Sequence, residues 1–254
     1  MTDALLEDLR SGRLRAAVPD PSAGDGWRVD STVKEAILER FRDRRQRKWS
    51  PEEAFTFVDR EALPPRPGPS ADVRIVPGGT MVRDGAYLGD GVVVMPPSYV
   101  NIGAWIGPGT MVDSHVLVGS CAQVGAGVHL SAGVLIGGVL EPPGARPVVV
   151  EDEAFIGAGC ILLEGVLVGR GAVIAAGVTL TATGRLYHLV EERMLTGSVE
   201  QPLVVPAGSV VVPGTRPLGG AFAAEHGLAA ATAIIVKRRD AGTLARTALE
   251  EALR

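Results

Sequence analysis

The chain has 254 residues, enough for a substantial hydrophobic core and a smaller module beside it. Its formal net charge of −4 provides no broad basic field, which argues against nucleic acid or an acidic membrane surface as a partner. No apolar run approaches the ~20 residues that span a bilayer, and we expect no signal peptide at the polar N-terminus. The two cysteines, Cys121 and Cys160, show no zinc or redox spacing, so we predict reduced thiols in a cytoplasmic protein.

Residues 1–70 are predicted to form a small helical N-terminal domain that ends in a proline-rich linker, Leu63–Pro69. Thr32–Glu35 has the pattern of a capping box that opens a helix. The basic run Arg42–Lys48 is interpreted as the solvated end of this helix, with a phosphate-binding patch as the alternative. The apolar stripe of the helix consists of Val33, Ile37, Leu38 and Phe41.

Within residues 71–219, an aliphatic side chain recurs at every sixth position from Val76 to Ile136 and, after a shift of register, from Val150 to Leu180. Neither a helix nor a simple strand produces this period. A period of six is typical of a β-solenoid, in which three hexapeptides make one coil of about 18 residues. The small residue four places after each aliphatic one is predicted to pack inside the narrow coil. One predicted ladder of stacked side chains is Val76, Val94, Val112 and Leu130, and another is Val82, Val100, Val118 and Ile136.

Two segments interrupt the repeat, at 141–147 and at about 181–203. Residues 220–254 are predicted to form a C-terminal cap, with a strand at Thr232–Val236 and a helix that ends with Leu244–Leu253. Such a cap is needed because the end of a solenoid otherwise exposes unpaired strand edges.

Four segments are more specific than the repeat itself: Leu9-Arg-Ser-Gly-Arg-Leu-Arg15, Ser98-Tyr-Val-Asn-Ile-Gly103, Gly119-Ser-Cys-Ala-Gln123 and Ile136-Gly-Gly-Val-Leu-Glu-Pro142. Together they resemble the tetrahydrodipicolinate N-succinyltransferases, a family of hexapeptide-repeat acyltransferases. The resemblance covers most of the chain from about Leu9 onward, although the N-terminal domain is shorter than is usual in the family.

The resemblance implies a mainly β protein built around a left-handed parallel β-helix. It also implies a homotrimer with active sites in the clefts between neighbouring subunits. The reaction would transfer a succinyl group from the co-substrate succinyl-CoA to the amino group of ring-opened tetrahydrodipicolinate, a step of diaminopimelate and lysine biosynthesis. No permanently bound cofactor and no metal are implied.

The resemblance also suggests site residues. Asp113 matches an aspartate that contacts the acceptor, and it is the first catalytic and substrate-binding candidate, with a turn-forming aspartate as the alternative reading. Arg74 matches an arginine that grips an acceptor carboxylate, a task suited to its forked donors, but it could also be an ordinary surface residue. Glu164 matches the second of two family glutamates and is the other catalytic candidate.

Some positions depart from the family. Where the family has an arginine, this chain has Gly159. Where the family has the first of its two glutamates, which is commonly assigned a catalytic role, this chain has Ile161. His115 is either a base near neutral pH or a packing residue. The segment Ile161–Val166, together with Glu141–Pro143, is closer to tetrahydrodipicolinate N-acetyltransferase, so acetyl-CoA is the alternative donor.

A solenoid of this kind also suits functions of other classes. A non-catalytic solenoid scaffold is one alternative. A carbonic anhydrase of this fold needs three histidines on one zinc, and the spacing of the four histidines does not support it. An acyltransferase with a catalytic histidine would use His115 or His129. Cys121 is interpreted as a structural residue rather than a nucleophile.

Overall fold

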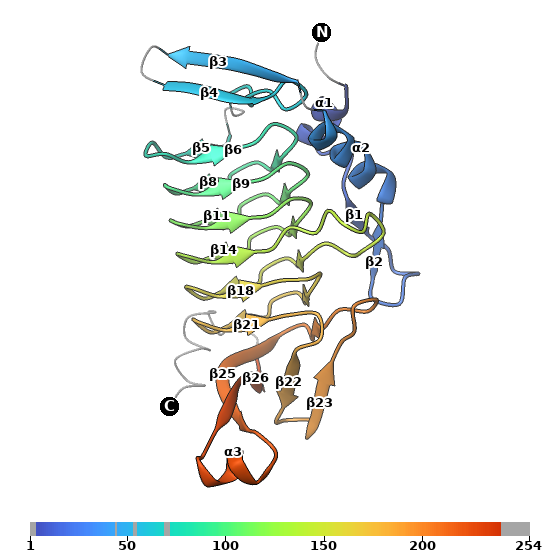
Figure 1. Ribbon diagram of the computed structural model, residues 1–254, viewed down its shortest axis with the longest axis vertical. Helices are drawn as coiled ribbons and strands as arrows, with labels where there is room; N and C mark the ends of the chain where they lie inside the picture. Colours follow the sequence, from blue (N-terminus) through green and yellow to red (C-terminus); the bar gives the residue numbers. More distant parts are fainter. Residues whose placement is uncertain (1–3, 44, 53–54, 69–71, 240–254) are drawn as a thin grey trace.

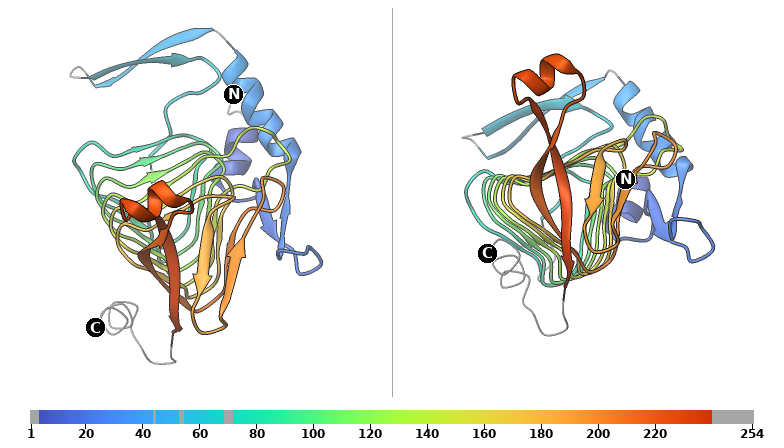
Figure 2. Two further views of the ribbon diagram at one scale, coloured as in Figure 1. Left: turned by 60° about the horizontal axis from the view of Figure 1, so that its bottom comes forward. Right: turned by 90° about the horizontal axis from the view of Figure 1, so that it is seen from below.

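The structure is a triangular prism of stacked coils with an N-terminal segment attached along one side (Figure 1). It is a computed structural model that describes residues 4–43, 45–52, 55–68 and 72–239. Each of the first six coils contributes one two-residue strand to each of three parallel sheets. The view along the prism shows the coils superposed around a common core (Figure 2). The predicted left-handed parallel β-helix is confirmed.

We number the sheets in the order in which the chain visits them. Sheet I contains β5 (Arg74–Ile75), β8 (Val93–Val94), β11 (Met111–Val112), β14 (His129–Leu130), β17 (Phe155–Ile156), β20 (Val173–Ile174) and the first residues of β25 (Ser209–Pro217). Sheet II contains β6 (Met81–Val82), β9 (Tyr99–Val100), β12 (Leu117–Val118), β15 (Leu135–Ile136), β18 (Ile161–Leu162) and β21 (Thr179–Leu180). Sheet III contains β7 (Tyr87–Leu88), β10 (Trp105–Ile106), β13 (Gln123–Val124), β16 (Val149–Val150), β19 (Leu167–Val168) and β24 (Val204–Val205).

The prism has three corners, which we name by the sheets that they join. The chain passes from sheet I to II to III within each coil, so every coil has one I/II, one II/III and one III/I corner. Both interruptions of the repeat lie at the II/III corner, between β15 and β16 and between β21 and β24. The other two corners therefore remain short and regular.

The predicted ladder from Val82 to Ile136 is confirmed, because β6, β9, β12 and β15 pair in that register. In the other ladder, Val94, Val112 and Leu130 stack as predicted, but the residue above Val94 is Ile75. The prediction of Val76 at that position is wrong. The corner that follows contains Gly78 and Gly79, both at positive φ, and accommodates one extra residue before Val82.

The small residues inside the prism link successive coils by hydrogen bonds. The Thr110 hydroxyl donates to the Gly125 carbonyl (2.8 Å) and accepts from the Val128 amide (3.1 Å). In the coil above, the Ser98 hydroxyl donates to the Asp113 carbonyl and accepts from the Val116 amide in the same way. Cys160 occupies the equivalent position, and burial raises the pKa of its thiol to about 11. Position four of the hexapeptide thus satisfies buried polar groups as well as filling space.

The N-terminal segment is less helical than predicted. It contains α1 (Ala4–Arg10) and α2 (Ser31–Arg42), but also the hairpins β1 (Ala17–Pro19) with β2 (Trp27–Val29) and β3 (Gln46–Glu52) with β4 (Phe55–Arg60). Since α2 ends at Arg42 and β3 follows, the basic run does not continue the helix. The capping-box prediction is wrong as well, because Asp30 is the N-cap and its side chain accepts from the Thr32 amide.

Helix α2 packs against the II/III corner through its predicted apolar stripe. Ile37 is fully buried with Ile102 and Cys121 in one cluster. Gly103 sits at this contact with φ 74°, and a Cβ there would lie 2.8 Å from the Ile37 Cδ1 atom. Burial raises the pKa of the Cys121 thiol to about 12, so the thiolate is not accessible near neutral pH. This supports the interpretation of Cys121 as a structural residue.

The β1–β2 hairpin covers the outer face of sheet III through stacked aromatic and cationic groups. The Arg15 guanidinium lies 3.8 Å from the ring centroid of Trp105 and 5.7 Å from that of Trp27. Trp105 in turn stacks on Tyr87 at 4.9 Å. The Trp27 indole N–H donates to Glu151 (3.1 Å). These contacts attach the β1–β2 hairpin to the outer face of sheet III.

Lys34 on α2 is a charged residue at a dry interface. Its side chain is fully buried and its Nζ donates to the Ala145 carbonyl in the first interruption of the repeat. No carboxylate pairs with it among the described residues. Burial lowers its pKa from 10.5 to about 8. Folding therefore favours loss of the Lys34 proton.

We expect this group to destabilise the fold below pH 8 by about 3 kcal/mol. Because its pKa is lower in the folded chain than in the unfolded chain, the penalty fades as the pH rises from 8 to 10.5. Urea unfolding of the wild type and of Lys34→Met between pH 7 and 10.5 measures this difference. At pH 7 the variant should have the larger free energy of unfolding, and the difference from the wild type should shrink as the pH rises to 10.5. An equal pH dependence of both proteins would contradict the assignment.

The C-terminal part closes the other end of the prism. The second interruption forms β22 (Arg185–His188) and β23 (Arg193–Thr196), and β25 pairs with β26 (Ala229–Arg238) as a long arm tipped by α3 (Ala221–Glu225). β26 also pairs with β22, so the arm joins sheet I. The predicted strand Thr232–Val236 lies within β26 and is confirmed, whereas the predicted helix Leu244–Leu253 lies outside the described residues. None of the described helices has the length and apolar character of a bilayer span.

Candidate active site

Asp113 lies at the I/II corner of the third coil, directly after β11. Its amide donates to the Leu130 carbonyl (2.9 Å) in the coil below. One carboxylate oxygen accepts from the Ser114 amide (2.7 Å), which fixes the side chain at the turn. The residue is half-buried and has no ion-pair partner among the described residues. The second oxygen of its carboxylate is therefore left for a ligand.

His115 shares this corner with Asp113. It is exposed and adopts a left-handed φ of 60°, held by donation from its amide to the Pro97 carbonyl (2.7 Å). The structure therefore places an imidazole and a carboxylate two residues apart on one exposed turn. In the single chain, His115 therefore lies near Asp113 and outside the packed core of the prism.

Arg74 lies on the outer face of sheet I, in the first coil. Its strand β5 pairs with β8, which pairs with β11, so Arg74 stands two strands above the end of β11. Two strand spacings separate the two backbones by about 10 Å. Arg74 is exposed and has no ion pair among the described residues. It remains free to bind an anion at this side of the prism.

Glu164 is not part of the same group of side chains. It lies at the II/III corner of the fifth coil, exposed, with φ 56°. Its carboxylate accepts from the Ala182 amide (3.1 Å) in the next coil. Within one chain, the two predicted catalytic carboxylates thus lie at opposite edges of sheet II.

Below Asp113 the I/II corner is smooth. The exposed positions in the next three coils are all Ala or Gly: Ala132, Gly133, Ala158, Gly159, Ala176 and Gly177. A Cβ at Gly159, where φ is 69°, would meet no atom within 4 Å, so a side chain there would project into solvent. Among the described residues, this corner therefore forms a track of exposed backbone with no side chain larger than a methyl group, leading away from Asp113. The other position that departs from the family, Ile161, is not at this corner but on the outer face of sheet II.

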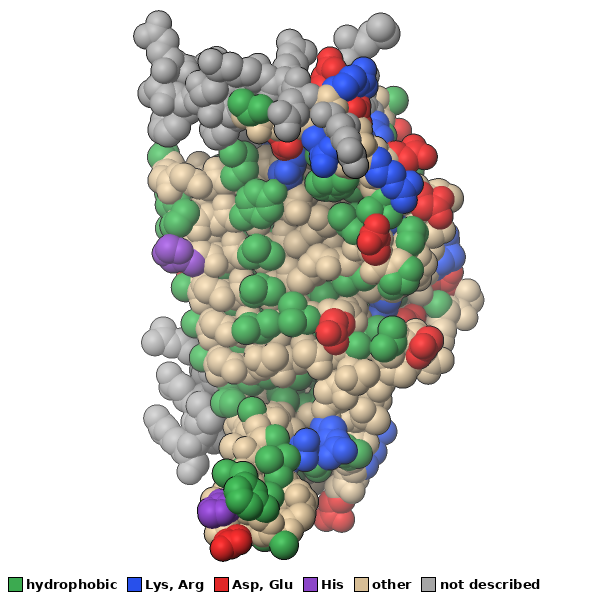
Figure 3. Space-filling model, viewed as in Figure 1, with side chains coloured by type: hydrophobic (Ala, Val, Ile, Leu, Met, Phe, Trp, Pro, Cys, Tyr) green, Lys and Arg blue, Asp and Glu red, His purple; other side chains and the backbone are tan. Residues whose placement is uncertain are grey.

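The track ends at a cavity of about 410 Å³ near the C-terminal end of the prism. The cavity lies between Gly177 on the sixth coil, the start of the second interruption and the β25–β26 arm. Arg185 and Arg216 both line it, and neither has an ion pair among the described residues. Lys and Arg side chains gather on this part of the surface in Figure 3. Thr179, Thr181 and Thr183 add hydroxyl groups to the lining, whereas the Thr232 hydroxyl donates to the Arg185 carbonyl at 3.0 Å.

These residues were missed by the sequence reasoning. Arg185 and Arg216 meet only because β22 pairs with β26, which pairs with β25. No local pattern marks such a long-range pairing. As for metals, the described residues contain no group of three or more His, Cys, Asp or Glu side chains placed to hold an ion.

Comparison with known proteins decides the family. A family model described as the hexapeptide repeat of succinyl-transferase matches residues 147–182. A 2,3,4,5-tetrahydropyridine-2,6-dicarboxylate N-succinyltransferase from Idiomarina loihiensis is 44% identical over 98% of this chain and 87% of its own length. One of the same name from Albidiferax ferrireducens is 41% identical over 98% of this chain and 87% of its own length. The chain belongs to the tetrahydrodipicolinate N-succinyltransferase family. The predicted resemblance is thereby confirmed.

Among solved structures, a chain from Campylobacter jejuni is described as a 2,3,4,5-tetrahydropyridine-2-carboxylate N-succinyltransferase. It matches with a TM-score of 0.46 and 17% identity. The match covers 99% of this chain but 64% of that chain, so this protein spans less than two thirds of its length.

Proposed function

We propose that the protein transfers a succinyl group from succinyl-CoA to the amino group of ring-opened tetrahydrodipicolinate, in diaminopimelate and lysine biosynthesis. The observation that carries this proposal is the identity of 44% to a succinyltransferase over nearly the whole chain. The half-buried carboxylate of Asp113, at a regular corner of the prism, is the proposed centre of the reaction. We place the activity in the cytoplasm, where both small-molecule substrates would be available.

The acceptor is a dicarboxylate with a reacting amine, and two features suit it. Asp113 accepts a hydrogen bond from the amine and orients its lone pair toward the thioester. Arg74, about 10 Å up the prism, pairs with a carboxylate of the acceptor through its forked donors. The amine nitrogen forms a bond to the thioester carbonyl carbon and the carbon–sulfur bond breaks. The proton lost by the amine balances the proton gained by the sulfur, which leaves as the thiol of coenzyme A.

The donor fits the track and the cavity below Asp113. From the third coil to the sixth, the I/II corner descends three strand spacings, about 14 Å. The pantetheine arm of coenzyme A has roughly the reach of four extended residues, ~14 Å. With its phosphates in the cavity beside Arg185 and Arg216, the arm can follow the exposed backbone of the track and bring the thioester to Asp113.

We further propose that the active protein is a homotrimer that packs through sheet II. The outer side chains of this sheet are uncharged and form a mostly apolar column, visible on the face shown in Figure 3. They are Met81, Tyr99, Leu117, Leu135, Ile161 and Thr179. In a closed threefold ring, the I/II corner of each chain meets the II/III corner of the next. Such packing would bring Glu164 of one chain toward Asp113 of its neighbour.

A thiol-release assay with tetrahydrodipicolinate tests the proposed reaction. We expect turnover with succinyl-CoA to exceed that with acetyl-CoA. Preference for acetyl-CoA would reassign the protein to the acetyl-transferring activity. Absence of turnover with both donors would contradict the proposed reaction.

The phosphate-binding role is tested by the double substitution Arg185→Gln and Arg216→Gln. We expect KM for succinyl-CoA to rise about 10- to 100-fold with little change in kcat, because charged hydrogen bonds to the phosphates are lost far from the reacting atoms. Arg193→Gln is the matched control, since Arg193 lies in the same excursion but pairs with Glu191 at 2.7 Å. An unchanged KM in the double variant would place the phosphates elsewhere.

A further inference from the structure

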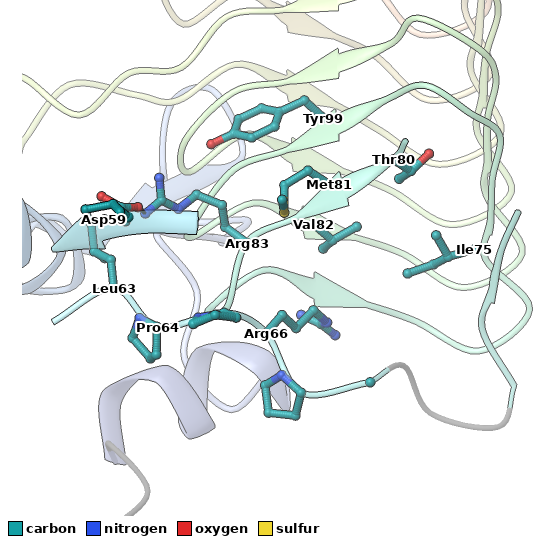
Figure 4. A pocket seen from close by; sticks show the side chains of 14 residues that line it. Asp59, Leu63, Pro64, Arg66, Ile75, Thr80, Met81, Val82, Arg83 and Tyr99 are labelled. Carbon is teal, nitrogen blue, oxygen red and sulfur yellow. Dashed lines mark hydrogen bonds and ion pairs between the residues drawn. The ribbon is translucent and has the colours of Figure 1, made fainter. Parts of the chain in front are cut away.

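A second cavity lies at the opposite end of the prism from the proposed donor site. Its volume is about 560 Å³, and it separates the first coils from the chain segment that precedes them (Figure 4). Residues 63–68, taken as a linker in the sequence analysis, form one wall, with Leu63 buried. Ile75, Met81 and Val82 form the wall opposite. The volume falls in the range of small-molecule sites.

The cavity contains a cation without a direct counter-ion. Arg66 is partly buried, and one of its Nη atoms donates to the Ala86 carbonyl. Its Nε is buried without a hydrogen-bond partner, and no described carboxylate forms an ion pair with it. The nearby Asp84 is already paired with Arg10 at 2.6 Å. Burial lowers the pKa of Arg66, against the attraction of Asp84, and the positive charge of Arg10 lowers it further.

The other charges at the cavity cancel. Arg83 and Asp59 both line it and form an ion pair with each other, as Figure 4 shows. Asp59 is therefore not available to bind a cationic ligand. Tyr99 and Thr80 offer hydroxyl groups whose present hydrogen bonds are long, at 3.5 and 3.4 Å. The cavity thus has apolar walls, two hydroxyl groups with long hydrogen bonds, and one cationic side chain, Arg66, that has no ion-pair partner among the described residues.

We propose that this cavity binds a small amphipathic monoanion, a carboxylate with an aliphatic body, whose carboxylate pairs with Arg66. A bound carboxylate would supply the partner that Arg66 lacks, and an aliphatic chain would cover Leu63, Ile75 and Val82. Proline residues 64, 65 and 67 restrict the backbone of the covering wall, so the wall is largely formed before binding. The site is separate from Asp113 and from the donor cavity, and its Met81 and Tyr99 also belong to the sheet II column of the proposed trimer.

Octanoate is the probe, titrated by calorimetry into the full-length protein. We expect saturable binding that weakens at least tenfold in Arg66→Met, which keeps an apolar stem but removes the guanidinium. Arg13→Met is the matched control, because Arg13 is exposed and paired with Asp8 away from the cavity. 1-Octanol should bind more weakly than octanoate. Absence of saturable binding, or equal affinity in Arg66→Met, would overturn the proposal.

Methyl spectroscopy of the wild type makes the test independent of any substitution. Met81 lines the cavity, whereas Met111 on sheet I and Met194 on β23 do not. With 13C-labelled methionine methyl groups, octanoate should shift the Met81 resonance and leave the other two in place. A shift at Met111 or Met194 without one at Met81 would place the ligand outside the cavity and contradict the assignment.

Discussion

Asp113→Ala is expected to lower kcat/KM for succinyl transfer by about 10²- to 10⁴-fold, the usual contribution of a positioned acid–base group. The reason is that one oxygen of this carboxylate is used at the turn while the other is left for the acceptor amine. Steady-state thiol release measures the effect. Asp113→Asn should lose nearly as much activity, since an amide can still accept from the Ser114 amide but carries no charge to favour the polarised amine.

Asn101→Ala provides the matched control for the turn itself. Asn101 follows β9 as Asp113 follows β11, and its side-chain oxygen accepts from the Ile102 amide at 2.8 Å. The same turn bond is thus removed at the II/III corner, where no carboxylate is lost with it. Comparable activity losses in Asn101→Ala and Asp113→Ala would mean that the turn bond matters, not the carboxylate. An active Asp113→Ala would remove this residue from the mechanism.

Much of the prism follows from local rules. Each inward position needs an aliphatic side chain in every coil, so the spacing of Val118 and Ile136 is enough to predict that they stack. Ile75 was missed because the spacing rule assumes six residues between strands, and the Gly78–Gly79 corner holds one more. The β1–β2 hairpin was missed too, although the turn-forming composition of residues 20–26 was a usable signal.

The functional groups are harder to place because they depend on which corner carries them. The motif around Asp113 was enough to predict it as a site residue. That Asp113 and Glu164 lie at different corners of the prism becomes clear only when each is assigned to the strand that it follows, β11 in sheet I and β18 in sheet II. Arg66 is in a proline-rich segment that resembles a linker, and only its position at the end of the prism reveals the cavity. Long-range contacts of this kind leave no mark in a single sequence.

Leu117→Arg is expected to convert the proposed trimer into monomers and to abolish most succinyl transfer. Leu117 is on the third of the six strands in the apolar column of sheet II and is 38% exposed in the single chain. In a threefold assembly through this sheet, three guanidinium groups would be brought together without counter-ions, at a cost of several kcal/mol. Light scattering coupled to size-exclusion chromatography measures the molar mass, and the thiol-release assay measures the activity.

Val204→Arg is a close match for Leu117→Arg on another face. Val204 is the outward residue of a two-residue strand in sheet III and is 40% exposed. The two substitutions therefore add the same charge at sites of equal exposure and equal local structure. If sheet II is the interface, Leu117→Arg alone yields monomers, and activity falls because Asp113 and the II/III corner of the next chain no longer meet. Dissociation by Val204→Arg with an intact Leu117→Arg trimer would assign the interface to sheet III instead.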